Sequence, residues 1–154
     1  MNIFHEDFLD FLRALSEAEV DYILVGGYSV VLHGYLRTTG VLDVWIQPES
    51  ENYDRLMLAF QQFGLPVTAF SKEQFLDPGL VDVFTFGRPP VALDLMTKVK
   101  GLEFNKAFDR AVVHEFEGIP VRYLHISDLI DAKRSAGRYK DLDDLEQLRK
   151  LKNN

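Results

Sequence analysis

Two aspartates stand alone inside apolar stretches of the kind that form buried strands. Asp43 lies in Leu-Asp-Val-Trp-Ile at residues 42–46, and Asp94 lies in Val-Ala-Leu-Asp-Leu-Met at residues 91–96. An unpaired carboxylate is costly to bury, so we expect each aspartate to have a polar environment. Either the two share one polar site on a sheet face, or each pairs with a basic residue such as Arg37 or Lys98. The pattern leaves both interpretations open.

A pair of glycines follows the short apolar run at residues 22–25. A strand that leads into glycines and then a helix offers backbone N–H groups that a phosphate can approach, because no Cβ intervenes. Gly26 and Gly27 are therefore candidate phosphate-binding residues, although a simple tight turn is the other interpretation. Ser29 follows closely, either as a hydroxyl ligand of phosphate or as a cap of the helix.

Three basic residues are further candidates for binding an anion. Arg37 precedes the strand of Asp43 and either contacts substrate or braces its loop. Lys133 lies near the end of an expected helix, where the helix dipole alone favours a cation. Arg138 either holds a phosphate or forms a salt bridge with one of the acids of the following segment, Asp141, Asp143 and Asp144.

The chain resembles the minimal bacterial branch of the nucleotidyltransferase superfamily from about Tyr22 to Leu148. In that superfamily a Gly-Gly or Gly-Ser turn precedes an Asp-x-Asp strand, and a third aspartate comes from a later strand. The segments that carry the resemblance are Gly26-Gly27, His33-Gly34, Arg37-Thr38-Thr39-Gly40, Asp43-Val44-Trp45, Asp94-Leu95-Met96-Thr97 and the tail from Asp128 to Asp141.

The resemblance implies a Mg²⁺-dependent enzyme, with Mn²⁺ as an alternative ion, that transfers an NMP from an NTP such as ATP to a hydroxyl acceptor. It implies that Asp43 and Asp94 are catalytic metal ligands, and that the nucleotide-binding residues are Gly26, Gly27, Ser29, Arg37 and Lys133. Acceptors in the superfamily are RNA ends, proteins or small molecules. Several members are toxins of toxin–antitoxin or phage-defence pairs, which would give this chain an antitoxin partner.

One position departs from the superfamily pattern. The first carboxylate of Asp-x-Asp would stand at position 41, and this chain has Val41. Residues 41 and 43 point to the same side of a strand, so both would reach the same metals. Since valine has no oxygen ligand, we expect one of two Mg²⁺ ions to be lost and transfer to be impaired. Val41 is either a natural loss that leaves a nucleotide- or partner-binding module, or an introduced inactivating change, or a gap filled by Asp82.

The elements that would position these residues can be predicted from periodicity and turn signals. Strands and helices are mixed without strict alternation, which indicates an α+β fold with a small mixed sheet flanked by helices. Residues 1–154 fit one domain. We expect strands at 22–25, 42–46, 81–86, 91–96 and 120–124, and helices at 4–15, 28–33, 50–63, 104–113, 127–136 and 141–151.

Composition excludes several classes of function. The chain has 17 basic and 24 acidic residues and no cysteine, so thiol catalysis and disulfides are excluded, and duplex DNA is an unfavourable partner. The four histidines lack the spacing of a zinc site. No apolar run is long enough for a membrane span, and the first residues include acids where a signal peptide is basic. We therefore expect a cytoplasmic protein.

Overall fold

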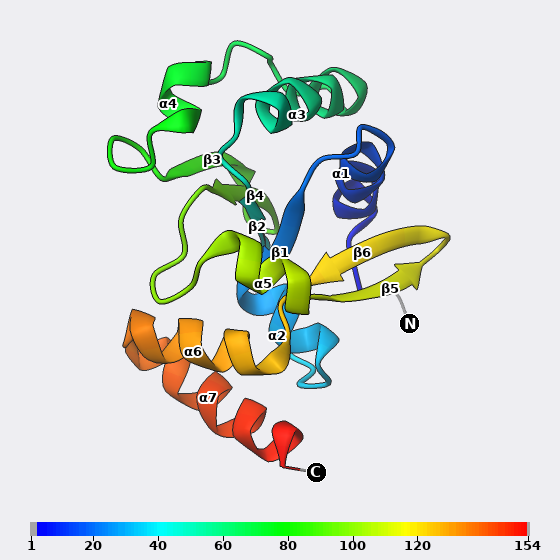
Figure 1. Ribbon diagram of the computed structural model, residues 1–154. Coiled ribbons are helices and arrows are strands. Elements are labelled where there is room, and N and C mark those ends of the chain that lie inside the picture. The colour runs from blue at the N-terminus through cyan, green and yellow to red at the C-terminus, as the bar shows by residue number, and fades with distance from the viewer. Residues whose placement is uncertain (1–2, 154) are drawn as a thin grey trace.

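Within residues 3–153, which the computed structural model describes, the strands form one mixed sheet in the order β3-β4-β2-β1-β6-β5 (Figure 1). The strands are β1 (Tyr22–Val25), β2 (Val41–Ile46), β3 (Val83–Arg88), β4 (Val91–Met96), β5 (Val112–Phe116) and β6 (Ile119–Tyr123). The pairs β2/β4 and β1/β6 are parallel, and β1/β2, β3/β4 and β5/β6 are antiparallel. The expected α+β fold with a mixed sheet is confirmed.

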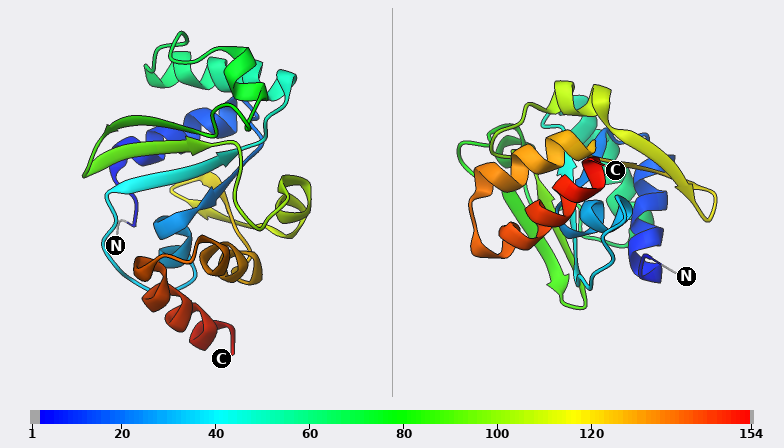
Figure 2. Two further views of the ribbon diagram at one scale, coloured as in Figure 1. Left: turned by 90° about the vertical axis from the view of Figure 1, so that its left-hand side faces the viewer. Right: turned by 90° about the horizontal axis from the view of Figure 1, so that it is seen from below.

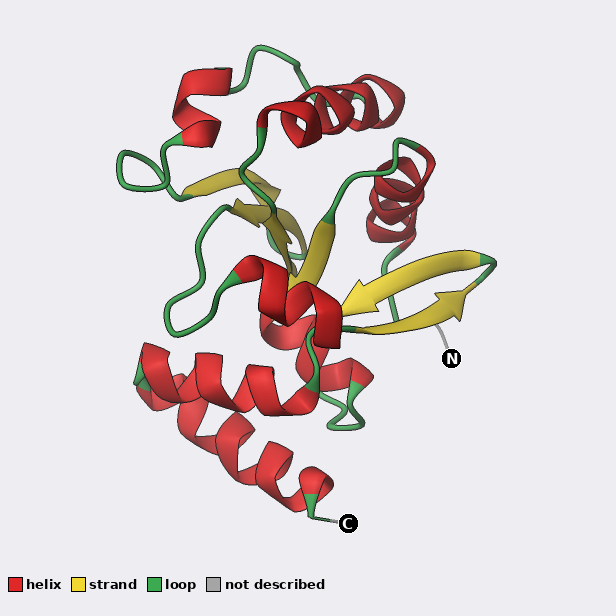
Figure 3. Ribbon diagram, viewed as in Figure 1, coloured by secondary structure: helices red, strands yellow, loops and turns green. Residues whose placement is uncertain are grey.

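Helices cover both faces of this sheet (Figures 2 and 3). They are α1 (Glu6–Glu17), α2 (Gly26–Leu32), α3 (Ser50–Phe63), α4 (Lys72–Leu76), α5 (Phe104–Arg110), α6 (Ile126–Ala136) and α7 (Tyr139–Lys152). In Figure 2 the sheet lies between α3 and α4 on one side and α6 and α7 on the other. None of the helices in residues 3–153 has the length and apolar character needed to cross a membrane.

The alternation of side chains along β2 assigns the two faces of the sheet. Leu42, Val44 and Ile46 are buried in the larger core cluster with residues of α1 and α3. Trp45 points the other way into a smaller cluster, built with residues of α5, α6 and α7. Because the side-chain period of a strand is two residues, Asp43 shares the face of Trp45. The predicted separation of the β2 side chains is therefore confirmed.

The expected elements agree with the structure wherever local signals are strong. The strands at 22–25 and 91–96 have the predicted bounds, and the helix at 50–63 ends as predicted at Gly64, in the left-handed region with φ 103°. The helix that we expected to start at Ser127 starts at Ile126, because the ring of His125 accepts the N–H of Ser127 and caps it. Gly137 ends this helix as predicted.

Other expectations are wrong at their bounds. The helix expected over 104–113 ends at Arg110, because the following residues form β5 and pair with β6. The strand expected at 81–86 is shifted to Val83–Arg88, so that its pairing with β4 continues up to the turn at Pro89-Pro90. Residues 66–79, which had no assignment, contain α4, capped by Ser71. The last helix begins at Tyr139 and not at Asp141.

Candidate functional site

A cavity of about 700 Å³ opens on the face of the sheet that carries Asp43. The end of β1 with the first residues of α2, the strands β2 and β4, the loop after β4, and the helices α6 and α7 form its walls. Its polar lining comprises Gly26, Gly27, Arg37, Thr39, Asp43, Asp94, Lys98, Lys100, Lys133, Arg138, Asp141, Asp143 and Asp144. Of the residues that the sequence singled out as functional, all except Ser29 line this space.

Asp43 and Asp94 lie side by side across two neighbouring strands. They are direct register partners in the parallel pair β2/β4, and both are half-buried. Residues paired in this way project to the same face, so the two carboxylates meet in one cavity. Thr85 on β3 is paired with Asp94, and its hydroxyl donates a hydrogen bond of 2.9 Å to Asp94 Oδ1. No ion pair joins Asp94 to Lys98 among the described residues.

The two glycines lie directly against this pair of strands. Gly26 has φ 66°, and a Cβ added to it would lie 2.1 Å from Asp43 Oδ2. A Cβ at Gly27 would lie 3.0 Å from Thr39 Oγ1 and 3.1 Å from Arg37 Nη2. Any side chain at Gly26 would therefore collide with the carboxylate of Asp43, while its backbone conformation also favours glycine. The turn leaves its backbone open to the cavity beside Asp43.

Ser29 lies behind the glycine turn. Its side chain is fully buried, and its hydroxyl donates a hydrogen bond of 2.6 Å to the carbonyl oxygen of Gly26. It stands outside the lining of the cavity. In this structure Ser29 holds the first turn of α2 in place, and the turn itself faces the cavity.

Val41 lies where the sequence pattern places a missing carboxylate. It lines the cavity, and it precedes Asp43 by two residues on β2, so its side chain projects to the same face. Asp82 does not take its place. The carbonyl of Asp82 accepts the N–H of Thr97 beyond the end of β4, whereas Val41 is paired with Ala92 near its beginning. The suggestion that Asp82 supplies the carboxylate missing at position 41 is wrong for this reason.

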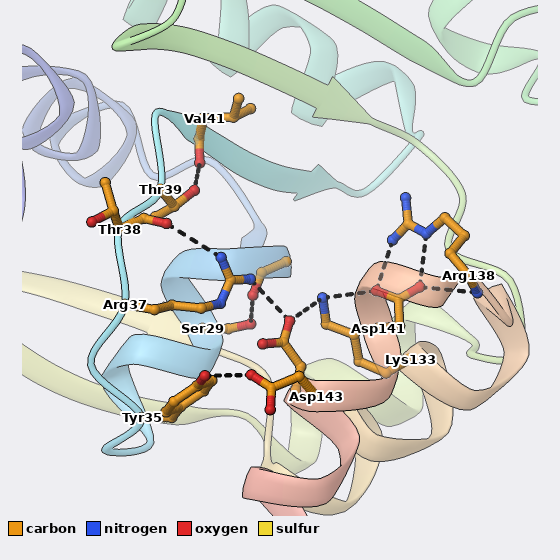
Figure 4. A network of polar contacts seen from close by, with 12 residues as sticks. Ser29, Tyr35, Arg37, Thr38, Thr39, Val41, Lys133, Arg138, Asp141 and Asp143 are labelled. Carbon is orange, nitrogen blue, oxygen red and sulfur yellow. Dashed lines mark hydrogen bonds and ion pairs between the residues drawn. The ribbon is translucent and has the colours of Figure 1, made fainter.

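Two of the predicted anion-binding cations reach the cavity from different elements and meet at α7 (Figure 4). Arg37 Nη2 donates to Asp144 Oδ2 at 2.9 Å. Lys133, only 7% exposed, lies 3.1 Å from the same oxygen and 3.2 Å from Asp141 Oδ1. A buried ammonium needs such partners, so the helix dipole alone does not explain Lys133.

Arg138 completes this arrangement at the start of α7. Its Nε donates to Asp141 Oδ2 at 2.7 Å, so the expected salt bridge with a following acid is confirmed. Burial acts to raise the pKa of Asp141, but the hydrogen bonds from Arg138 and the charge of Lys133 outweigh it and hold that pKa below its ordinary value. Asp141 accepts the backbone N–H of Arg138 as well, which fixes the first turn of α7.

Sequence reasoning missed Thr85 and the role of Asp144. Asp141 and Asp144 are spaced i, i+3 on α7, which places both on one helix face, and this spacing was the available signal. No local pattern connects Thr85 with Asp94, because their contact depends on the register of β3 and β4. The apolar wall is a third omission, formed by residues such as Val99, Leu129 and Ala132.

The oxygen ligands of the cavity show which metal ion these residues suit. Within residues 3–153 no group of three or more histidine or acidic side chains is arranged to hold a metal ion. Mg²⁺ is commonly bound through one or two carboxylates together with substrate phosphates. Asp43 and Asp94 therefore fit one Mg²⁺ held jointly with a triphosphate, while Val41 offers no oxygen ligand beside them. Comparison of the chain with models of known protein families and with curated proteins finds no match.

Proposed function

We propose that the cavity is the site of a Mg²⁺-dependent nucleotidyltransferase that binds an NTP and transfers its NMP to a hydroxyl acceptor. In this proposal Asp43 and Asp94 hold the metal, with Mn²⁺ able to replace Mg²⁺. Gly26, Gly27 and the cations Arg37 and Lys133 bind the triphosphate. The acceptor is an RNA end, a protein or a small molecule.

The observation that carries the proposal is the juxtaposition of Asp43, Asp94 and Gly26 in one cavity. The two aspartates are register partners on parallel strands, and the space for a Gly26 Cβ is taken by the Asp43 carboxylate. A carboxylate pair beside the glycine backbone at the start of α2 suits a metal-bound phosphate, because carboxylates ligate Mg²⁺ and backbone N–H groups approach phosphate oxygens. The cavity of about 700 Å³ has room for a nucleotide.

The chain's own residues have distinct roles in this proposal. The acceptor oxygen forms a bond to the α-phosphorus, the bond from that phosphorus to the bridging oxygen breaks, and pyrophosphate leaves. Asp94 takes the proton of the acceptor hydroxyl, while the hydrogen bond from Thr85 fixes its carboxylate. Bound Mg²⁺ supplies charge neutralisation for the phosphates. Arg37 and Lys133 retain the leaving pyrophosphate.

Val41 favours a second candidate function on the same fold. It lines the cavity on the face of Asp43 without offering an oxygen ligand. A chain with one metal ligand missing can bind an NTP while its transfer rate is low. The alternative is thus a nucleotide- or partner-binding module, of the kind found as a toxin–antitoxin or defence component.

Restoring the missing carboxylate tests the proposal. Each α-labelled NTP is incubated with Mg²⁺ or Mn²⁺ and with total cellular RNA, and label is followed into the RNA and into the protein. The unsubstituted chain, Val41→Asp and the uncharged control Val41→Asn are compared. We expect Val41→Asp to transfer label at least about a hundredfold faster than either of the others, since one group that stabilises developing charge contributes about that much.

The three outcomes separate the two functions. Label with Val41→Asp alone supports a transferase disabled at one metal ligand. Equal label with all three variants supports a transferase for which position 41 is unimportant. NTP binding without label in any variant contradicts transfer to RNA or to the protein and favours the binding module. Asp94→Asn in the Val41→Asp background is the control, and it should abolish any label.

A further inference from the structure

We propose that Asp144, together with Asp141, positions the cations that bind the triphosphate, so that these two buried acids of α7 build an anion site without contacting the anion. The α7 charge network, as we call it, consists of Arg37, Lys133, Arg138, Asp141 and Asp144. This inference rests on the proposed function, because it assigns a role to residues around the same cavity.

The geometry of Asp144 supports a positioning role. One of its oxygens, Oδ2, accepts from Arg37 Nη2 at 2.9 Å and lies 3.1 Å from Lys133 Nζ. Asp144 is only 3% exposed, so water does not compete for this oxygen. A single buried atom thus connects the loop after α2 with α6, and it fixes the relative position of two cations from separate elements.

Asp141 extends the same arrangement to the third cation. It lies 3.2 Å from Lys133 Nζ and 2.7 Å from Arg138 Nε, and it is 1% exposed. Lys133 therefore lies between two carboxylates that belong to one face of α7. Figure 4 shows the resulting chain of contacts, which runs from Arg37 through α7 to Arg138.

The network leaves N–H donors unused, and the cations that carry them line the cavity. Arg37 Nε is buried and has no hydrogen-bond partner among the described residues. Lys133 has three N–H groups and two carboxylate partners, so one donor remains. Arg138 donates to Asp141 through Nε and Nη2, which leaves Nη1. A phosphate group in the cavity can satisfy the remaining donors of Lys133 and Arg138 while the carboxylates keep their contacts.

A purely electrostatic role and a positioning role of Asp144 predict opposite effects of its removal on anion binding. Three cations and two carboxylates give the α7 charge network one net positive charge. Asp144→Asn adds one more unit, so a purely electrostatic role predicts tighter binding of an anion. A positioning role predicts weaker binding, because Arg37 loses its only ion-pair partner among the described residues and no longer keeps its place.

Asp143 provides a matched control on the next residue. It also lines the cavity, but it is exposed, and its carboxylate accepts a hydrogen bond from the Tyr35 hydroxyl and forms no ion pair among the described residues. Asp143→Asn removes the same charge as Asp144→Asn without touching the network. Asp144→Glu is the third variant, because it keeps the charge and moves it by one methylene.

The experiment measures ATP binding in EDTA by calorimetry, together with the ¹H–¹⁵Nε signal of Arg37, assigned by its loss in Arg37→Lys. Thermal unfolding confirms that each variant is folded. We expect Asp144→Asn to bind ATP about tenfold more weakly, as for the loss of a charged hydrogen bond. It should also lose the slowly exchanging Arg37 signal. Asp143→Asn should bind ATP at least as tightly as the unsubstituted chain, and Asp144→Glu should show a smaller loss than Asp144→Asn.

The outcomes distinguish the two proposals. If Asp144→Asn binds ATP as tightly as Asp143→Asn, or keeps the Arg37 signal, the positioning role is overturned while the nucleotide site stands. If no variant binds ATP but Asp144→Asn alone loses the Arg37 signal, the positioning role stands and the proposed nucleotide function fails. Should Asp144→Asn not fold, unchanged ATP affinity in Asp144→Glu would overturn the positioning role.

Discussion

The two faces of the sheet differ in how they are held together. The face toward α1 and α3 is packed by aromatic and aliphatic side chains, among them Phe11 and Phe60, which are fully buried. Stacked and edge-to-face ring pairs connect α3, the loop before α4 and β3 on that side. The opposite face has a smaller apolar cluster, and beside it the cavity with Asp43 and Asp94.

The comparison shows how one sheet can have an apolar core on one face and buried charges on the other. Apolar burial on one side gives stability that does not depend on exact charge placement. Charges on the other side are costly to bury, and they are tolerated where opposite charges meet, as in the α7 charge network. The sheet thus has its larger apolar core on one face, and a smaller apolar cluster with the cavity beside it on the other.

The largest expected effect is on the free energy of unfolding, when a residue on one face of the sheet is substituted at a time. Phe60→Ala should lower the free energy of unfolding by about 3–5 kcal/mol, because a fully buried ring is removed, and should leave the affinity for ATP unchanged. Asp94→Asn should cost less than about 1 kcal/mol, since it mainly weakens the hydrogen bond from Thr85. Urea denaturation measures the unfolding free energy of each variant, and calorimetry measures the affinity for ATP. An equal loss of stability in the two variants would break the comparison.

A smaller effect is expected at two glycines with similar backbone angles. Gly26 has φ 66° beside Asp43, and Gly118 has φ 78° with nothing near the position of a Cβ. Gly118→Ala should cost about 1–2 kcal/mol from the left-handed backbone alone. Gly26→Ala should cost clearly more, because its Cβ also collides with Asp43 Oδ2. Thermal unfolding of both variants separates the cost of the collision with Asp43 from the cost of the left-handed backbone. Equal losses of stability in the two variants would mean that the Asp43 side chain moves aside at no cost.

The smallest effect is a dependence of stability on pH that differs between the faces. Because the pKa of Asp141 is lowered in the folded state, its contribution to stability is present above about pH 4 and is lost as the pH falls through the lowered pKa. Burial raises the pKa of Tyr22 on the apolar face. That contribution is present below about pH 10 and is lost as the pH rises through the raised pKa.

Denaturant titrations across the pH range check this prediction. Asp141→Asn should flatten the acidic decline of the unfolding free energy and leave the alkaline decline as it is. Tyr22→Phe should flatten the alkaline decline alone. A variant that alters both limbs equally would show that the two faces do not titrate independently.

The sequence predicted the parts of the fold and site that depend on short-range pattern. The apolar runs gave β1 and β4, and the alternation around Asp43 gave the correct face for its carboxylate. Contacts that depend on register or on distant helices could not be predicted. Nothing local in the sequence connects Arg37 with Asp144. The strand β5 was not predicted because its first residues also suit the end of the preceding helix.

The hydrogen bond between Arg37 and Asp144 spans 107 positions of the sequence. Contacts between residues so far apart carry a larger loop-closure cost than local ones, and they form after the elements that they connect. None of the strand pairings involves α7, so α7 can detach while the sheet persists. Detachment of α7 would separate Arg37 and Lys133 from Asp144, so that the residues to which the proposed function assigns the triphosphate would lose their fixed positions while the strands stay paired.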